Sequence, residues 1–230
     1  MSDSKSPQTR DESISFFGTI IAGQSHEVTN VLNIISELSG LQLDLLRAQE
    51  QDLPVNLPRL QEVTTRIQNQ VHRGETIIRN INGFAHSADL PVTVFDLKEM
   101  LDRVLFLAQR SARLAQVELV SDLPPESIVL ESNPFCVQQA VFTCIELALG
   151  CASDTRRVEV GCSVSADGAE IRVAGADHAT EDKNTDERLE LLQLLLESIG
   201  GSVVKRPGDE AACVLVLRVP RHHGVESGKP

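Results

Sequence analysis

Apolar residues near the start of the chain recur at alternating steps of three and four positions, a pattern typical of helices that pack one stripe against other helices. The spacing predicts a first helix over residues 12–50 and, after a short turn at 51–56, a second helix that starts near Pro58. At 1.5 Å per residue the first helix is about 55 Å long, and such a helix cannot bury its stripe alone. We therefore expect an antiparallel helical hairpin, two copies of which close a dimeric four-helix bundle. The first stripe is Ile14, Phe17, Ile21, Gln24, Val28, Val31, Ile35, Leu38, Gln42 and Leu45, and the second is Leu60, Thr64, Ile67, Val71, Gly74, Ile78, Ile81 and Ala85.

The remainder of the chain mixes helical patterns with short alternating runs that are typical of strands. Asp96 can cap a helix over 97–116. Asn133-Pro134 supplies a cap and a first-turn proline for a helix that ends near residue 150, and a further apolar helix covers 186–199. The predicted class is α+β, in which the hairpin is followed by a two-layer α/β sandwich of about five strands covered by three helices. The predicted strands are 117–120, 127–130, 157–164, 170–173, 202–205 and 212–219.

Polar residues and a proline at 86–91 indicate a boundary between two domains. We expect a helical-hairpin domain over residues 11–88 and the α/β domain over residues 89–221. The polar ends, residues 1–10 and 222–230, are predicted to be disordered tails.

Composition narrows the class of protein. The formal charge is −12, without a long basic block, which argues against binding nucleic acid or an anionic membrane. No apolar run approaches the ~20 residues that span a bilayer, and the start has no signal-peptide pattern, so we expect a cytoplasmic protein. The five cysteines form no CxxC pair and are interpreted as small buried hydrophobic residues, so no metal site is expected.

His26 is the residue most open to chemistry in the first helix. If Val28 occupies position a of the heptad, His26 falls at position f, on the side away from the stripe. Glu27 lies beside it, and Asn30 lies one turn further along the same outer face. An exposed imidazole next to a carboxylate on a rigid helix is a candidate nucleophile with an orienting group, although a lone surface histidine is more often only a solvated side chain.

Charged residues of the second helix receive a simpler interpretation. His72 is taken as structural or solvated rather than catalytic. The solvated face of this helix is predicted to hold Arg66, Arg73, Glu75 and Arg79, and contact of some of these charges with an acidic partner is the alternative.

The stretch 25–30, Ser-His-Glu-Val-Thr-Asn, resembles the H-box of bacterial sensor histidine kinases. The resemblance extends over the order of elements from about residue 14 to residue 220. It implies that His26 accepts phosphate, that Glu27 helps to activate it, and that Asn30 aids dephosphorylation of a partner. The proline that is common in the family five positions after the histidine is Val31 here.

The resemblance also covers the ATP-binding domain of that family, but the residues of its ATP site are missing. Thr143 and Leu147 occupy the positions of the asparagines that hold Mg²⁺, and leucine cannot ligate Mg²⁺. Ala174 stands for the aspartate that reads adenine, and only Gly175 remains of the glycines around it. The phosphate-wrapping stretch, residues 181–188, holds no glycine and is acidic. We expect a degenerate ATPase domain that does not bind ATP.

These features predict a histidine phosphotransferase of a two-component phosphorelay. Phosphate would pass between His26 and the aspartate of a response-regulator receiver domain, and the receiver would supply Mg²⁺, so that this chain needs no cofactor of its own. The receiver is expected to dock on Asn33, Ile34 and Glu37. Two alternatives stay open: a non-catalytic pseudo-kinase that binds and inhibits a kinase or a receiver, and an active ATP-dependent histidine kinase with a divergent ATP site.

Overall fold

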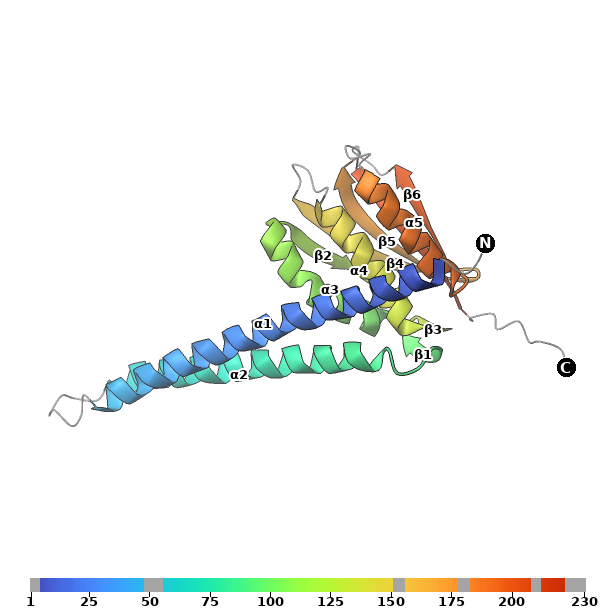
Figure 1. The fold of residues 1–230 in the computed structure, drawn as a ribbon. Helices are drawn as coiled ribbons and strands as arrows, with labels where there is room; N and C mark the ends of the chain where they lie inside the picture. The colour runs from blue at the N-terminus through green and yellow to red at the C-terminus, as the bar shows by residue number, and fades with distance from the viewer. Residues whose placement is uncertain (1–4, 48–55, 151–155, 178–182, 208–211, 222–230) are drawn as a thin grey trace. The chain divides into compact units, whose positions relative to one another are not determined.

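The computed structural model describes residues 5–47, 56–150, 156–177, 183–207 and 212–221 (Figure 1). By their contacts the residues form two compact units. The helical unit is Phe17–Gly83, and the α/β unit combines Met1–Phe16 with Phe84–Pro230. The predicted limits of the domains, 11–88 and 89–221, stay predictions.

The helical unit contains most of two long helices, α1 (Lys5–Arg47) and α2 (Leu57–His86). They run antiparallel, as Figure 1 shows. Toward the end of α1, Gln42 donates a hydrogen bond to Thr64 across the pair, with 3.4 Å between Nε2 and Oγ1. Gly74 allows the helices to approach, because a Cβ at this position would lie only 3.3 Å from Cγ1 of Val31.

Burial within the helical unit tests the predicted stripes. On α1 the predicted positions Gln24, Val31 and Leu38 are buried. On α2 the agreement is partial: Gly74 of the predicted stripe meets α1, but Val63 and Ile77 are buried whereas their neighbours Thr64 and Ile78 of the predicted stripe are exposed in one chain. The helix presents two adjacent apolar lines, and hydrophobic periodicity alone does not distinguish the one that faces α1.

Residues 5–10, predicted to be a disordered tail, are the first residues of α1 here. A nucleated helix gains one hydrogen bond for each residue added, and Pro7 lies in the first turn of α1, where a proline is tolerated. The predicted tail at 222–230 lies outside the described residues.

The α/β unit is built on a five-stranded sheet with the order β2-β4-β5-β7-β6. Strands β2 and β4 pair in parallel, and the other neighbours are antiparallel. The strands are β2 (Glu118–Asp122), β4 (Arg157–Ser165), β5 (Gly168–Asp177), β6 (Ser202–Pro207) and β7 (Ala212–Pro220). The sheet of about five strands is therefore confirmed.

A separate two-stranded ribbon joins β1 (Thr93–Asp96) to β3 (Val129–Ser132). The sequence pattern did not predict β1. The predicted strand at 127–130 overlaps β3, which pairs with β1 and not with the large sheet. Both strands are only four residues long, so each offers little alternation to recognise.

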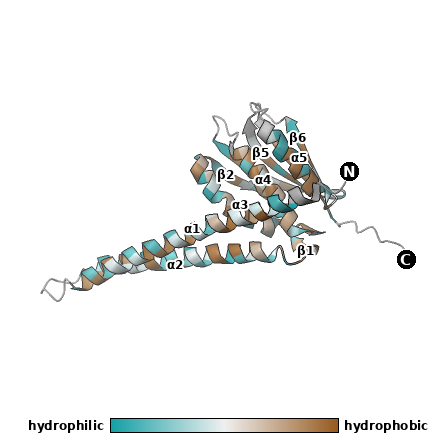
Figure 2. Cartoon of the chain, in the orientation of Figure 1, coloured by the Kyte–Doolittle hydropathy of each residue, from teal (hydrophilic) through white to brown (hydrophobic). Residues whose placement is uncertain are grey.

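Three helices, α3 (Leu97–Ala115), α4 (Pro134–Gly150) and α5 (Lys183–Glu197), lie on one face of the sheet (Figure 1). The central helix α4 is apolar along most of its length, whereas α1 and α2 alternate between apolar and polar residues (Figure 2). Ile145 and Cys144 of α4 are fully buried. Each fully buried large aliphatic side chain contributes about 1.5–3 kcal/mol, so α4 is the centre of this core.

Two helix starts follow the predicted caps. Oδ1 of Asp96 accepts a hydrogen bond from the amide of Lys98 at 2.8 Å, and Oδ2 accepts one from Oγ of Ser127 at 2.6 Å. The hydrogen bond from Ser127, with those from the first amides of α3, lowers the pKa of Asp96. At the start of α4, Oδ1 of Asn133 accepts from the amide of Cys136 at 3.0 Å.

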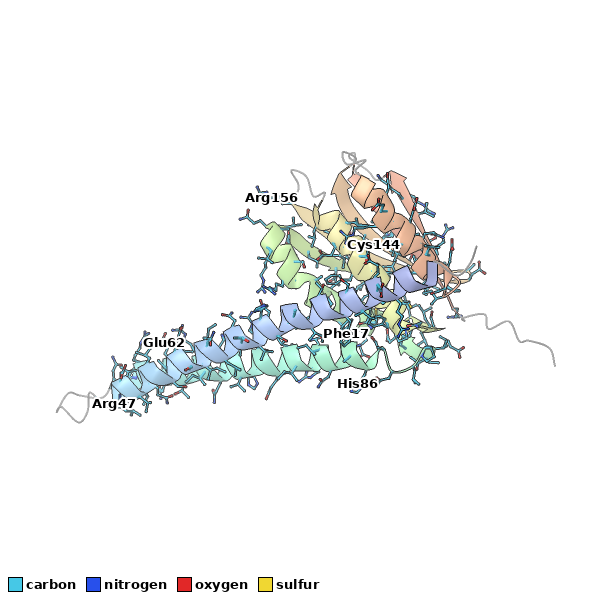
Figure 3. The ribbon with its side chains drawn as sticks, in the orientation of Figure 1. Phe17, Arg47, Glu62, His86, Cys144 and Arg156 are labelled. Atoms are coloured by element: carbon cyan, nitrogen blue, oxygen red, sulfur yellow. The ribbon has the colours of Figure 1, made fainter. Side chains whose placement is uncertain are left out.

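Cys136, Cys144 and Cys162 are free thiols. Cys144, labelled in Figure 3, and Cys162 are buried, as predicted, and Cys136 is half-buried. Burial raises the pKa of all three thiols. The described side chains do not include those of the other two cysteines, Cys151 and Cys213.

Within the described ranges, no helix combines the length and the apolar character that crossing a membrane requires.

Candidate functional site

His26 lies in the middle of α1, and its side chain is exposed. Asn30, one turn further along the helix, is also exposed. Between them, Oγ1 of Thr29 donates a hydrogen bond to the backbone carbonyl of Ser25 at 2.9 Å, so this side chain is turned back on its own helix. The outward placement predicted for His26 is therefore present, and the chemical roles of His26 and Asn30 stay predictions.

Glu27 is held differently from its neighbours. Its side chain is only 17% exposed, and its Oε2 accepts a hydrogen bond from Nη2 of Arg73 on α2 at 2.7 Å. The sequence interpretation placed Arg73 on a solvated face, and the structure corrects it, because this arginine forms an ion pair across the two helices. The heptad pattern contained no signal for this pair, since periodicity does not give the register between α1 and α2.

The neighbouring charges of α2 agree better with a solvated face. His72 is exposed, and its Nδ1 lies 3.3 Å from Oε2 of Glu75, which is also exposed. Arg66 and Arg79 are exposed as well.

The residues predicted to bind a partner lie about two to three turns beyond His26 on α1. Asn33 and Glu37 are exposed, and Ile34 is half-buried. Leu32 beside them is 60% exposed, so this part of the helix presents apolar as well as polar surface. Their role in docking stays a prediction.

The α/β unit contains a second region of interest, between α4 and α5. Thr143, which aligns with a metal-binding asparagine of the family, lines a cavity of about 70 Å³ there. Pockets that bind small molecules usually measure about 300–1,000 Å³, so this cavity has room for little more than a water molecule or two. The other residues that line it are Glu12, Gln139, Arg188, Leu191, Leu192 and Leu195.

The first residues of α1, which belong to the α/β unit, pack against α4 beside this cavity. Oγ of Ser13 donates a hydrogen bond to Oε1 of Gln139 at 2.7 Å. The ring of Phe16 lies 5.4 Å from that of Phe142, 5.7 Å from that of Phe135 and 5.5 Å from that of Phe84, measured between centroids. Such aromatic contacts add to the area that the rings bury. The sequence predicted Phe17 as a stripe residue and did not identify the role of Phe16.

The two positions that align with metal-binding asparagines do not fit Mg²⁺. Leu147, the second aligned position, is 6% exposed and has no oxygen in its side chain. Thr143 supplies one hydroxyl, which is a poor substitute for the oxygen ligands of an ion that prefers octahedral coordination. Oε1 of the neighbouring Glu146 is buried and has no hydrogen-bond partner among the described residues. Within the described residues, His, Cys, Asp and Glu do not gather in threes that could hold a metal.

Gly175 has a structural reason to be glycine. Its φ is +121°, a β-bulge interrupts β5 between Ala174 and Ala176, and a Cβ here would collide with the carbonyl oxygen of Arg157. The remaining glycine of the aligned adenine-reading stretch is thus required by the sheet itself. In the acidic stretch 181–188, the side chains of residues 181–184 lie outside the described part of the chain, and α5 begins at Lys183.

No protein-family model and no curated protein matches the chain. Solved structures do match, and three of them are nucleotide-free or phasing crystal forms of the catalytic domain of histidine kinase ThkA. They are 12%, 15% and 14% identical to this chain, with TM-scores of 0.50, 0.51 and 0.51. Each match covers 58% of this chain and 97–99% of the ThkA domain. At these identities the likeness shows the fold: the chain contains an α/β domain with the fold of a histidine kinase catalytic domain.

Proposed function

We propose that this protein is a histidine phosphotransferase of a two-component phosphorelay. His26 would exchange phosphate with the aspartate of a response-regulator receiver domain. This role would place the protein in the cytoplasm. The observation that carries the proposal is the exposed imidazole of His26 on a long helix, next to a carboxylate that a second helix holds in place. The α/β unit, with the fold of a histidine kinase catalytic domain, agrees with two-component signalling.

The transfer needs few protein groups. A neutral ring nitrogen of His26 attacks the phosphorus of the receiver's aspartyl phosphate, the N–P bond forms as the O–P bond breaks, and the electron pair stays on the departing carboxylate. The ring keeps its proton on the other nitrogen, where Glu27 would accept the hydrogen bond and stabilise the positive charge that develops. Mg²⁺ bound by the receiver would neutralise charge on the phosphoryl group. The reverse reaction returns phosphate to aspartate.

Asn30 lies on the same outer face as His26. It would either orient a water molecule for hydrolysis or shape the contact with the receiver. Asn33, Ile34 and Glu37 would form the docking surface below the histidine, with the exposed Leu32 supplying apolar area.

Transfer without ATP is the finer part of the proposal. It is supported by the small cavity beside Thr143, the buried Leu147 and the packing of Ser13 and Phe16 against α4. Gly175 is explained by the bulge in β5 and therefore does not argue for a nucleotide. The α/β unit would then serve as a structural module with a docking surface.

A homodimer completes the proposed architecture. Val71 and Ile78 of α2 are 43% and 49% exposed, and Leu32 and Leu43 of α1 are 60% and 54% exposed. A pair of helices buries only one stripe from each, so these apolar residues need another surface. A second copy of the same helices would cover them in a four-helix bundle.

The direct test incubates the purified chain with receiver domains that carry labelled phosphate on aspartate. The wild type is expected to take up the label, and His26→Gln is expected to lose at least about a hundredfold of the rate, because the nucleophile is gone. His72→Gln is the matched control, since His72 is an exposed histidine on the partner helix, and it should label normally. Label that survives in His26→Gln would refute the phosphoacceptor role and favour a protein that only binds its partners.

A further inference from the structure

We propose that Arg73 is a positioning residue of the phosphoacceptor site. From α2, its guanidinium orients the carboxylate of Glu27 so that this carboxylate can accept a hydrogen bond from the ring of His26. This inference rests on the proposed function, because it assigns Glu27 a task that only a reacting His26 requires. It adds a residue from the second helix to a site that the sequence places wholly on the first.

The contact is close and partly shielded from water. Nη2 of Arg73 donates to Oε2 of Glu27 at 2.7 Å, and the two side chains are 38% and 17% exposed. A hydrogen bond between two charged groups at this distance belongs to the strong class. Without Arg73, the carboxylate would remain largely buried without this cation, and it would turn toward water to recover its hydration.

Other ion pairs of the helical unit differ from this one. Arg59 and Glu62 lie three positions apart on α2 with side chains 44% and 51% exposed, and His72 and Glu75 repeat that arrangement. Such pairs lie on one helix in water and have little effect on geometry. The pair of Glu27 and Arg73 joins residues 46 positions apart on two helices. The orientation of the Glu27 side chain therefore depends on the register between α1 and α2.

The link from this ion pair to His26 is the position of Glu27 in the sequence. Glu27 follows His26 directly in the sequence, and its Oε2 is occupied by Arg73, so the rotamer of the whole carboxylate is set from α2. An arginine side chain is suited to this because its planar guanidinium restricts the orientation of the carboxylate it binds, whereas a lysine ammonium acts as a point charge. A fixed carboxylate favours the ring tautomer whose N–H points toward it and leaves the other nitrogen free to attack.

The test uses the full chain and phosphoramidate, a small phosphodonor that needs no protein partner. The N–P bond of phosphoramidate breaks as the N–P bond to the His26 ring forms, and ammonia leaves. Labelling is followed in the wild type, Arg73→Gln, Arg73→Lys, Glu27→Gln and the double variant with both glutamines. Arg66→Gln is the matched control, because Arg66 is exposed and lies about two turns earlier on the same helix.

We expect Arg73→Gln and Glu27→Gln each to slow labelling by about tenfold. This is the usual loss of activity when a residue that orients a reactive group, without reacting itself, is removed. The double variant should be no slower than either single variant, because both changes remove the same fixed carboxylate. Arg73→Lys should recover part of the rate, and Arg66→Gln should match the wild type. Thermal unfolding of each variant shows that it is folded.

A second readout does not depend on phosphate transfer. The ¹⁵N chemical shifts of the His26 ring report the balance between its two neutral tautomers. Arg73→Gln and Glu27→Gln should change this balance in the same direction, and Arg66→Gln should not change it.

The two proposals fail in different ways. Losses of rate that multiply in the double variant, or a His26 ring spectrum that Arg73→Gln leaves unchanged, would overturn the positioning role. A wild type that takes no phosphate at His26, while Arg73→Gln still alters the ring spectrum, would refute the phosphotransferase and support the contact between Arg73, Glu27 and His26.

Discussion

The helical unit and the α4–α5 region of the α/β unit differ in how exposed their candidate functional residues are. On α1, His26 and Asn30 are exposed, and Glu27 is tied in place by Arg73. Between α4 and α5, the position of one expected metal ligand is the buried Leu147. The difference teaches that this fold does not require the expected ligands, because a fold depends on many buried residues and a site on only a few.

The packing of α4 explains why the fold does not depend on those ligands. Ile145 and Cys144 are fully buried, and they would stabilise the helix whether or not a nucleotide binds nearby. Residues that ligate a metal or a phosphate contribute little to that core. Thr143 and Leu147 at the aligned positions are therefore compatible with the layers of the unit.

The sharpest contrast between the units is expected from a pair of matched isoleucine variants. Ile145→Ala removes a fully buried side chain from α4 and should lower the free energy of unfolding by about 3 kcal/mol at any protein concentration. Ile78→Ala removes a side chain of α2 that is 49% exposed in one chain. Its effect should be small in dilute solution and grow with concentration if a second copy covers it.

Thermal unfolding at several protein concentrations measures both effects. A loss for Ile78→Ala that does not change with concentration would contradict the proposed dimer.

A smaller effect is expected at the start of α1. Phe16→Ala removes a half-buried ring that meets Phe84, Phe135 and Phe142, and it should cost about 2 kcal/mol, somewhat less than a fully buried phenylalanine. Ile14→Ala is the control, because Ile14 is 61% exposed on the same helix. Denaturant unfolding measures the difference, and equal losses in the two variants would show that the aromatic cluster does not anchor this segment.

The smallest effect concerns the cap of α3. Asp96→Ala should cost about 1 kcal/mol, because the first amides of the helix lose their acceptor. Since the folded pKa of Asp96 lies below its ordinary value, the ionised carboxylate stabilises the fold above about pH 4. This contribution is lost as the pH falls through the folded pKa.

Asp96→Asn is the control for the charge, because it keeps an oxygen acceptor and does not titrate. The difference in stability between wild type and Asp96→Asn, measured by unfolding from pH 7 to pH 2, should shrink toward low pH. A difference that stays constant over this range would contradict the pKa direction.

Much of the fold could be predicted from local patterns. Asp96 and Asn133-Pro134 marked the starts of α3 and α4, because caps act within a few residues of themselves. Part of the face of α2 that meets α1 was missed, since Val63 and Thr64 belong to adjacent lines that both look like a stripe. Distinguishing the lines needs the position of the other helix, which periodicity does not contain.

The candidate site could be predicted only on its own helix. The heptad placed His26 outward, because a helix fixes the direction of each side chain. The bond from Arg73 to Glu27, and the ring of Phe16 among three other rings, join residues far apart in the sequence. Such contacts depend on how elements pack, so no spacing rule in one segment reveals them.

The most direct measurement of the central claim follows where phosphate on His26 comes from. Two samples of the purified chain are prepared, one with labelled ATP and Mg²⁺ and one with a receiver domain labelled on its aspartate, and phosphorylation of His26 is detected by mass spectrometry. We expect label from the receiver and none from ATP. Label on His26 from ATP alone would contradict the account and identify the protein as a working kinase.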